Sequence, residues 1–527
     1  MKKIMCFMFC AALASVAWSQ ELHVASGGVI HVAPKSYVHV NGNMGVDGAG
    51  NLTVESNAAN SGALMVTGTA TGDISYVRYV PTDKWHFVSA PVTTQDIGAF
   101  AVDAANDIKN NIANTVYGIS VYNNANTPTE RWMYYGTPGN PTPLPGQQNA
   151  GLASSAGNFV NGKGYSNLRT SAGNYTFKGN MANADVGITI PVGDGTAENH
   201  HWGLVGNPYP SFLAGNTPAN ATNLLTHNAG ILKTGKVAIY VWDGTDYQAI
   251  NHSDPALFIA PGQGFIVEAK ANGETFTFPK ALQKPQTAAT AAFYKGEAMT
   301  SVTLFLSDGN TEKKTRLRYL DANATTGLDE GYDAGSYRDG VPTFSIDTHL
   351  VSDSTGLDFT IQCLPKADLE DIVVPVAVYA KANDVLNFRT EIENLATGVN
   401  VYLEDKVNNT ITKLNDASYN VTVNADQNGI GRFYLYTIQG VLNIEDVFSL
   451  NNVSIYKTDN NTLRIAGLKT EGSATLKIYS ILGKEVADNS FNVQNINDVQ
   501  LPRLSTGVYI VKVVSNSGNH SKKIIIE

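Results

Sequence analysis

The segment WGLVGNP at residues 202–208 repeats the pattern of an earlier segment, WHFVSAP, at residues 85–91. In both, a Trp opens an alternation of apolar residues and a Pro ends it. Later in each copy, GKGY at residues 162–165 matches GQGF at residues 262–265. Such alternation favours half-buried β-strands, and internal repetition indicates two related units that pack together. This part of the chain is therefore predicted to be a duplicated β-module.

The regions on either side of the duplicated module also have the pattern of strands and turns. Before it, short β-branched runs such as VIHV at residues 29–32 are separated by Asn-Gly, Asp-Gly and Thr-Gly pairs. This pattern fits a β-meander and a β-solenoid equally well. After the module, alternation as in VTLFL at residues 302–306 indicates half-buried antiparallel strands, and the turn spacing suggests a sandwich or jelly roll. The predicted fold class is all-β, a multidomain array of β-sandwich or jelly-roll domains.

A chain of 527 residues is long enough for three or four domains at about 100–200 residues each. The predicted organisation is a signal peptide at 1–19, an N-terminal β-repeat or meander region at 20–80, the duplicated β-module at 81–285 with copies at about 81–195 and 196–285, a jelly-roll-like β-sandwich at 286–440, a linker at 441–452, and a C-terminal domain at 453–527.

The N-terminus has the features of a secretory signal peptide. Lys2 and Lys3 precede an apolar run at residues 4–16, and small residues follow at Ala17 and Ser19. We predict cleavage after Ser19. The run is too short to span a bilayer, and no later segment is long and apolar enough for a transmembrane helix. The sequence thus predicts an exported protein.

Composition excludes several classes of protein. With 43% hydrophobic and 16% charged residues, the chain is neither disordered nor a coiled coil. Its formal charge of -10 falls to -12 when Lys2 and Lys3 leave with the signal peptide, which argues against nucleic acid as a partner. Two of the 3 Cys leave as well, so Cys363 has no intramolecular partner for a disulfide.

The C-terminal segment contains spaced elements that identify it. An apolar strand pattern ends in Gly-Lys, LSTGVY follows at residues 504–509, and KKIII follows at residues 522–526. In order and spacing, the last 75 or so residues resemble the type A C-terminal sorting domain of the type IX secretion system of Bacteroidota. The sorting-signal residues that the resemblance implies are Gly483, Lys484, Gly507, Tyr509, Lys522 and Lys523.

The resemblance implies a small Ig-like β-sandwich and a route of export. The expected partners are the type IX secretion translocon and a sortase-like protease that usually removes the domain. The expected route crosses the periplasm to the cell surface or the extracellular medium. The mature product would then be anchored to lipopolysaccharide or released.

Three further segments resemble large surface proteins of the same bacterial group. They are WGLVGNPYPS at residues 202–211, APGQGFIV at residues 260–267, and LEDK at residues 403–406 followed by Arg432-Phe433. The resemblance implies a location rather than a reaction. In the first segment, the two Pro residues stop sheet pairing while the Trp and Tyr provide apolar mass, so a rigid corner after a strand is favoured over a ligand platform.

Motifs that carry catalysis are missing from the sequence. It contains no His-Glu-x-x-His zinc motif, no Cys pair for zinc, no P-loop and no Gly-x-Ser-x-Gly elbow. Cys363 lies in a strand pattern, where a small buried hydrophobe is favoured over a nucleophile. His31, His39, His200 and His201 are interpreted as surface or turn histidines rather than metal ligands. No catalytic or cofactor-binding residue is assigned.

One segment resembles the front of a calcium loop. NADQNG at residues 424–429 has oxygen-bearing side chains at alternating positions and Gly at the sixth. Position twelve, where that loop needs a bidentate Glu, is Leu435. An ordinary hairpin turn is therefore favoured, and Asp426 and Asn428 are the candidate ligands if calcium binds.

The sequence as a whole predicts a non-enzymatic adhesin or outer-surface structural component that contacts glycans, proteins or neighbouring cells. The alternative is a secreted polysaccharide-active hydrolase or carbohydrate-binding protein. A hydrolase needs two carboxyl groups about 5–10 Å apart, which sequence spacing in a β-protein does not reveal. Among 24 Tyr and 5 Trp, exposed rings could stack on sugars, although most are expected in the core. A matrix protein without a discrete ligand is a third possibility.

Overall fold

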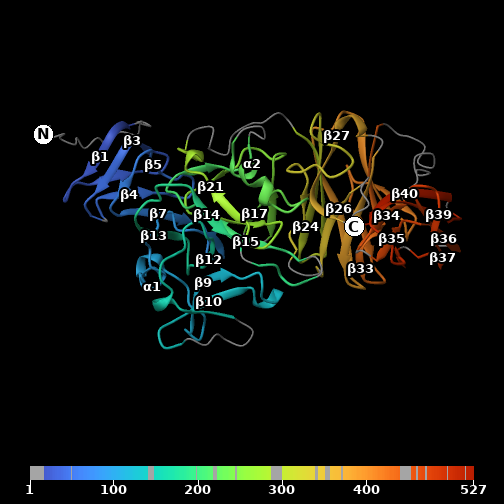
Figure 1. Cartoon of the computed structure of the whole chain (residues 1–527), viewed down its shortest axis with the longest axis horizontal. Helices are drawn as coiled ribbons and strands as arrows, with labels where there is room; N and C mark the ends of the chain where they lie inside the picture. The colour runs from blue at the N-terminus through green and yellow to red at the C-terminus, as the bar shows by residue number, and fades with distance from the viewer. Residues whose placement is uncertain are drawn as a thin grey trace. The chain divides into compact units, whose positions relative to one another are not determined.

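The computed structural model describes residues 17–526 except 49, 141–147, 191, 197–198, 218–221, 244–245, 287–298, 339–341, 351–356, 370–371, 440–452, 459–460, 469–471, 495 and 517. The predicted linker and most of the predicted signal peptide lie outside the described residues. The described chain is built of strands with a few short helices, so the all-β multidomain fold class is confirmed (Figure 1).

Two compact units make up the chain. The first comprises Met1–Lys233 and Ile239–Tyr294, and the second comprises Thr234–Ala238 and Lys295–Glu527. Among the described residues, no helix has the length and hydropathy needed to cross a membrane.

The first unit begins with a β-solenoid. The chain passes back and forth between two sheets, with β5 and β6 both in the first, and within each sheet these strands pair in parallel. A meander would pair antiparallel, because its chain reverses at every turn. The structure thus decides between the two arrangements that the sequence left open. One sheet contains β1 (Ala17–Val24), β3 (Tyr37–Val46), β5 (Ala63–Val66) and β6 (Ala70–Thr71), and the other contains β2 (Ile30–Val32), β4 (Leu52–Glu55) and β7 (Ile74–Val80).

The predicted cleavage site lies within β1. Pairing between β1 and β3 is interrupted between Ser19 and Glu21. Cleavage after Ser19 would therefore leave the second half of the strand, from Glu21 to Val24, paired with Asn43 to Val46. The solenoid would then keep the second half of its first strand.

Two sheets with the same strand order follow the solenoid. The first has the order β8-β12-β9-β10, with β11 at its edge, and the second has the order β15-β20-β17-β18. All neighbours among these two sets of four are antiparallel, and a short helix follows the first strand of each. The two sheets are therefore two copies of one folding unit. The elements are β8 (His86–Val88), α1 (Ile97–Val102), β9 (Val116–Tyr122), β10 (Trp132–Gly136), β11 (Gln148–Leu152), β12 (Tyr165–Asn167), β15 (Trp202–Gly206), α2 (Leu224–Asn228), β17 (Ile239–Trp242), β18 (Tyr247–Ile250) and β20 (Gly264–Glu268).

In each copy, a glycine turn accepts a backbone hydrogen bond from the other copy. The amide of Ser89 donates to the carbonyl of Gly262 (2.9 Å), and the amide of Gly206 donates to the carbonyl of Gly162 (2.9 Å). Both turn glycines have a positive φ, 80° at Gly162 and 66° at Gly262, which side chains disfavour. A Cβ on Gly206 would lie only 2.5 Å from the Cβ of Ser89. The repeated glycines are therefore explained by the close approach of the two copies.

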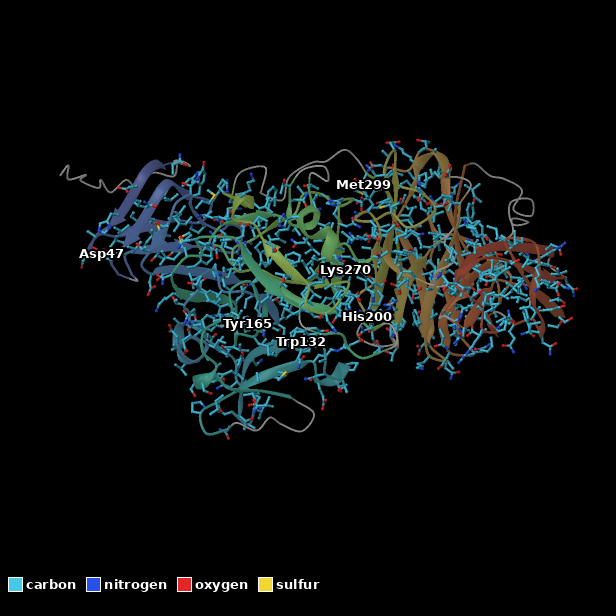
Figure 2. The ribbon with its side chains drawn as sticks, in the orientation of Figure 1. Asp47, Trp132, Tyr165, His200, Lys270 and Met299 are labelled. Atoms are coloured by element: carbon cyan, nitrogen blue, oxygen red, sulfur yellow. The ribbon has the colours of Figure 1, made fainter. Side chains whose placement is uncertain are left out.

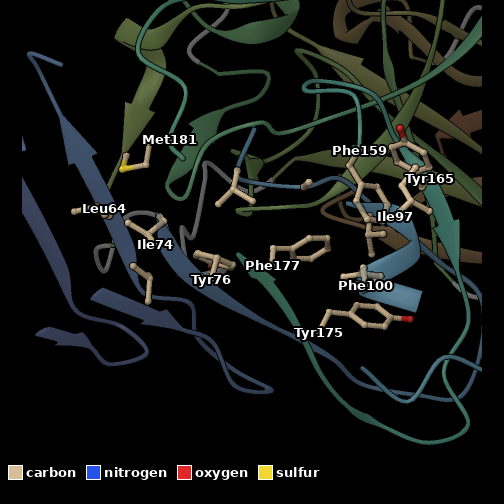
Figure 3. Packing of buried hydrophobic residues seen from close by; sticks show 14 of the residues in the cluster. Leu64, Ile74, Tyr76, Ile97, Phe100, Phe159, Tyr165, Tyr175, Phe177 and Met181 are labelled. Carbon is tan, nitrogen blue, oxygen red and sulfur yellow. The ribbon is translucent and has the colours of Figure 1, made fainter. Parts of the chain in front are cut away.

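A shared core joins the solenoid to the first copy. Phe100 of α1 stacks on Phe177 with ring centroids 4.8 Å apart and meets Phe159 edge-on at 5.1 Å. Figure 3 shows Phe177 beside Tyr76 of the solenoid, and Leu64 of the solenoid belongs to the same buried cluster. The remaining strands of the unit are β13 (Gly173–Gly179), which pairs with β7, β14 (Val186–Thr189), which pairs with β21 (Thr275–Phe278), and β16 (Phe212–Ala214), which lies between β19 (Phe258–Ile259) and β22 (Gln283–Lys284).

The second unit contains one curled sheet. Its strands from opposite ends of the sheet, β30 and β29, bury side chains in a single hydrophobic core, so the sheet wraps around that core. In spatial order the strands are β31 (Thr410–Lys413), β30 (Val399–Asp405), β33 (Gln427–Gln439), β28 (Val373–Ala380), β26 (Ser345–His349), β27 (Asp358–Pro365), β24 (Glu312–Leu320), β23 (Thr300–Ser307), β29 (Val385–Glu393) and β32 (Tyr419–Thr422), with β25 (Ala334–Gly335) beside β27.

The second unit ends in a small β-sandwich with its own core. Leu463 and Ile465 of one sheet are buried with Leu476, Ile478 and Val511 of the other. One sheet contains β34 (Ser454–Lys457), β35 (Thr462–Ala466) and β38 (Ile496–Gln500), and the other contains β37 (Glu485–Asn492), β36 (Ser473–Ser480), β39 (Gly507–Ser515) and β40 (Gly518–Ile526).

A buried ion pair links β30 to β33 in the curled sheet. Arg432 donates two hydrogen bonds to the carboxylate of Asp405, at 2.9 and 2.7 Å, and the Tyr419 hydroxyl donates a third at 2.9 Å. The side chain of Asp405 is fully buried. The LEDK and Arg-Phe segments of the sequence thus form a structural contact, because every oxygen of the buried carboxylate is satisfied.

We expect Asp405→Ala to destabilise this part of the sheet by about 3–5 kcal/mol, because it leaves the Arg432 charge buried without its partner. Hydrogen exchange of peptides from β30 and β33 in the full-length secreted chain, followed with increasing urea, measures the effect. Asp416→Ala is the matched control, since Asp416 is 78% exposed beside Lys413. Equal protection in the two variants would contradict the assignment.

Candidate functional site: an aromatic patch

Six half-buried aromatic side chains lie together on the first unit. They come from four strands, β8, β10, β17 and β18, and from the residue that precedes β8. Trp85 meets Tyr134 at 5.8 Å, Phe87 meets Trp132 at 5.6 Å, and Phe87 meets Tyr247 at 6.1 Å between centroids. The sixth ring, Trp242, meets Tyr247 at 5.0 Å. We call this surface the aromatic patch; it consists of Trp85, Phe87, Trp132, Tyr134, Trp242 and Tyr247. Figure 2 labels Trp132 on β10.

Strand alternation explains why these rings point away from the core. On β9, Ile119 and Val121 belong to the buried core, so Ser120 and Tyr122 point to the opposite face. Trp132 pairs with Tyr122 and Tyr134 pairs with Ser120 across the sheet. The rings of β10 therefore lie on the outer face of the sheet whose inner face forms the core. Trp242 and Tyr247 join the patch from β17 and β18 of the second sheet.

Small residues between the aromatic strands let the rings meet. Ser120 pairs with Ser166, and Ser166 pairs with Phe87, which places two serines in one row between Tyr134 and Phe87. Both serines are buried. Because they are short, side chains from β8 and β10 can close over the two strands that separate them.

The ring contacts make the patch rigid before any ligand arrives. Phe87 and Trp132 are nearly parallel at 26°, whereas Trp85 and Tyr134 are tilted by 63°. Rigid aromatic rings offer a large contact area at a low cost in conformational entropy. A half-exposed ring of this kind can stack on the apolar face of a sugar or on an apolar side chain of a protein.

Polar groups border the patch. The Oγ1 atom of Thr82 lies 3.0 Å from Nε2 of His86, and the exposed residues Asp83 and Lys84 precede Trp85. Burial lowers the pKa of His86, so this imidazole is neutral at neutral pH. The patch thus combines an apolar surface with groups able to hydrogen-bond hydroxyls.

The sequence did not predict that these six aromatic residues lie together. Trp85 and Phe87, and again Trp132 and Tyr134, are two residues apart on strands whose other face is also apolar. A strand with apolar residues on both faces is either buried on both faces or presents one apolar face to a partner. This pattern of apolar residues can be seen in the sequence, whereas the ring contacts between segments far apart in the chain cannot.

Two histidines were wrongly interpreted as lying on the surface. His200 and His201 are both buried where β15 begins. The Nδ1 atom of His200 lies 2.6 Å from Oε1 of Glu268, and the Nζ atom of Lys233 lies 2.8 Å from the same oxygen. The pairing of Trp202 with Glu268 places this carboxylate beside the histidine and out of water. Within the described part of the chain, no three His, Cys, Asp or Glu side chains converge on a metal position.

Asp347 and Asp358 form a carboxylate pair in the second unit. Arg338 bridges them, in a contact with Asp347 and at 3.5 Å from Asp358. Burial would raise the pKa of Asp358, but the hydrogen bond and charge of His349 with the charge of Arg338 outweigh it and lower this pKa to about 2. Burial raises the pKa of Asp347 despite Arg338. Both acids are held within one ion network with Arg338 and His349.

The other sequence candidates occupy separate positions. Cys363 is buried on β27. Asp426 and Asn428, the candidate calcium ligands, lie where β32 connects to β33, and Asp426 accepts hydrogen bonds from Lys381 (2.8 Å) and from the amide of Ala382 (2.9 Å). Both carboxylate oxygens are thereby engaged, and calcium binding there stays a prediction.

The residues predicted to form the sorting signal lie on one sheet and on the turn after β36. Gly483 has a φ of 80° in the turn after β36, and the exposed residue Lys484 follows it. Across the sheet, Ser480 pairs with Tyr509, and Tyr509 pairs with Ile524. The register therefore places the Gly-Lys turn, the start of β39 and the end of β40 side by side, while Lys522 pairs with Val511 in the middle of the ladder. The predicted sorting-signal residues are Gly483, Lys484, Gly507, Tyr509, Lys522 and Lys523.

We expect most of the fluorescence that acrylamide can quench to come from the patch. The fully buried Trp202 is the reference: Trp202→Phe should leave quenching nearly unchanged, because the half-buried rings remain. The triple variant Trp85→Phe, Trp132→Phe, Trp242→Phe should leave weakly quenched emission. Stern–Volmer quenching of residues 20–527 measures this. Stronger quenching in the triple variant than in Trp202→Phe would show that the patch is covered.

Comparison with known proteins identifies the C-terminal domain. The family model described as secretion system C-terminal sorting domain matches residues 451–527. The chain thus carries a type IX sorting tail, and this tail indicates export to the cell surface or extracellular space. No curated protein matches the chain.

A solved structure titled "Biofilm associated protein - BSP domain" covers 85% of this chain and 97% of its own, at 10% identity and a TM-score of 0.17, which is too low to indicate a shared fold. A second family model covers most of the chain before the sorting tail, at residues 9–436, and bears the description domain of unknown function (DUF8693). The chain belongs to the DUF8693 family.

Proposed function

We propose that this exported protein is a non-enzymatic adhesin that binds glycans through the aromatic patch. The observation that carries the proposal is the patch itself: six half-buried aromatic side chains, contributed by two sheets of the first unit, whose rings contact one another in pairs. Contiguous apolar surface on an exported protein is costly in water and marks an interaction site.

The distribution of tryptophan supports this proposal. Of the 5 Trp, Trp18 leaves with the predicted signal peptide and Trp202 is fully buried. The remaining three, Trp85, Trp132 and Trp242, all belong to the patch. Tryptophan contributes strongly to binding energy when it anchors a ligand.

The proposal assigns no glycoside hydrolase activity to the protein. Glycoside hydrolysis needs one carboxyl group that can protonate the leaving oxygen and a second that faces the sugar. Asp347 and Asp358 are tied to Arg338 instead, and Glu268 is tied to His200 and Lys233. After the sorting tail is removed, the protein would be attached to lipopolysaccharide or released.

We expect the secreted chain, residues 20–527, to bind a subset of a broad glycan array saturably. Trp132→Ala and Phe87→Ala should each weaken the best glycan about 10- to 100-fold, because each removes an anchor ring. Tyr479→Ala, which removes a half-buried ring from the sorting domain, is the matched control. Calorimetric titration gives the dissociation constants.

Two outcomes would contradict the proposal. Saturable binding that both patch variants retain would place the glycan site elsewhere. Silence across the array, with correctly folded protein, would favour a structural or protein-binding surface component.

Export depends on the sorting tail in this account. Removal of residues 453–527 should leave the protein in the periplasm, because the translocon then has no signal to recognise. Cell fractionation followed by surface protease treatment measures this. Normal display of the truncated chain on the surface would overturn the role of the tail.

A further inference from the structure

An apolar contact joins the sorting domain to the curled sheet within the second unit. Ala377 of β28 and Ile430 of β33 are buried together with Tyr456 of β34 and Ala466 of β35. This cluster is separate from the cores of both domains. It is therefore an interface rather than an extension of either core.

Strand alternation shows that the interface covers an outer face. On β28, Val376 and Val378 point into the core of the curled sheet, so Ala377 between them points outward. Ala377 and Ile430 are nevertheless 0% and 1% exposed. An outward face of an antiparallel sheet would ordinarily meet water, and here the sorting domain covers it.

A polar network surrounds the apolar contact. The ring of Tyr456 lies 4.6 Å from the ring of His349, whose Nδ1 atom is 3.1 Å from Oδ1 of Asp358. The Tyr379 hydroxyl donates to the other oxygen of Asp358 at 2.7 Å. The apolar centre and polar border are the usual anatomy of a protein interface.

The sorting domain fixes its own side of the contact. Arg464 donates to both carboxylate oxygens of Asp498, at 2.7 and 2.8 Å, which joins β35 to β38. A Cβ on Gly429 of the curled sheet would lie 4.0 Å from the guanidinium of Arg464. Charged and aromatic groups from both domains thus meet in one area.

We propose that the sorting domain is docked on this outer face, the seat, by non-covalent contacts that persist after the connecting segment is cut. The seat consists of His349, Ala377, Tyr379 and Ile430. The contact uses the sheet formed by β34, β35 and β38. The sorting-signal residues belong to the other sheet and its Gly-Lys turn, where Lys484 and Lys523 are exposed, so docking leaves them open to the secretion machinery.

Docking changes what a sortase-like cut achieves. While the chain is intact, the tether keeps the two partners at a high effective concentration. Cutting turns the contact into a bimolecular one, and only its own affinity then holds the sorting domain. Release becomes a second step, separate from peptide-bond cleavage.

The test places a site for a specific protease between residues 445 and 446 of the secreted chain, residues 20–527. After complete cutting, the two fragments should elute as one species from size exclusion at about 10 µM. Native mass spectrometry should report the sum of their masses. Separation of the wild-type fragments under these conditions would overturn the proposal.

Variants on each side of the interface test the seat. Tyr456→Ala on the sorting domain and Ile430→Glu on the curled sheet should each weaken association about a hundredfold or more and release the fragment. Tyr479→Ala, on the other sheet of the sorting domain, should leave it bound. If the Tyr456 and Ile430 variants both stay bound as tightly as the wild type, the proposed seat is wrong. Circular dichroism of the released fragments checks that each variant is folded.

Discussion

The first unit depends on two glycine turns that are exchanged between its repeated halves. Each turn presents a carbonyl to the strand of the other copy, and both turns need a backbone conformation that side chains disfavour. A Cβ on Gly264 would lie 3.0 Å from backbone and side-chain carbon atoms of Phe87. The close backbone approach that holds the two sheets together therefore also brings Phe87 into contact with Tyr247. The aromatic patch depends on this close packing of the two copies.

Buried charge has a similar organising role in the second unit. Only 16% of the residues are charged, and several of the charges that leave water do so in pairs. Asp405 with Arg432, and Asp347 and Asp358 with Arg338, are held by direct contacts between strands or their flanking loops. A buried pair contributes little net stability compared with an apolar one, but it penalises every register that separates its partners. In a curled sheet of many similar strands, this penalty selects one pairing.

The sequence predicted the parts of the fold that depend on local pattern. The repeated Trp and glycine segments correspond to two sheets of identical strand order, and the spacing near the C-terminus identified the sorting domain. Solenoid and meander could not be separated, because strand-and-turn patterns do not say which strands pair. The aromatic patch was missed for a related reason: Phe87, Trp132 and Tyr247 are distant in sequence and meet only through sheet order. His200 and His201 were misplaced because Glu268, which satisfies His200, lies 68 residues away.

The position of the first and last strands in the curled sheet has a mechanical consequence. The chain enters this domain at β23, which pairs with β24 and β29, and leaves at β33, which pairs with β28 and β30. Neither is an edge strand. If the protein acts as the proposed adhesin, tension between a ligand at the patch and the cell at the C-terminal side would pass through these two strands. Extraction of either one must rupture two hydrogen-bonded ladders together, so the domain resists peeling under flow in a way that a fold with edge termini would not.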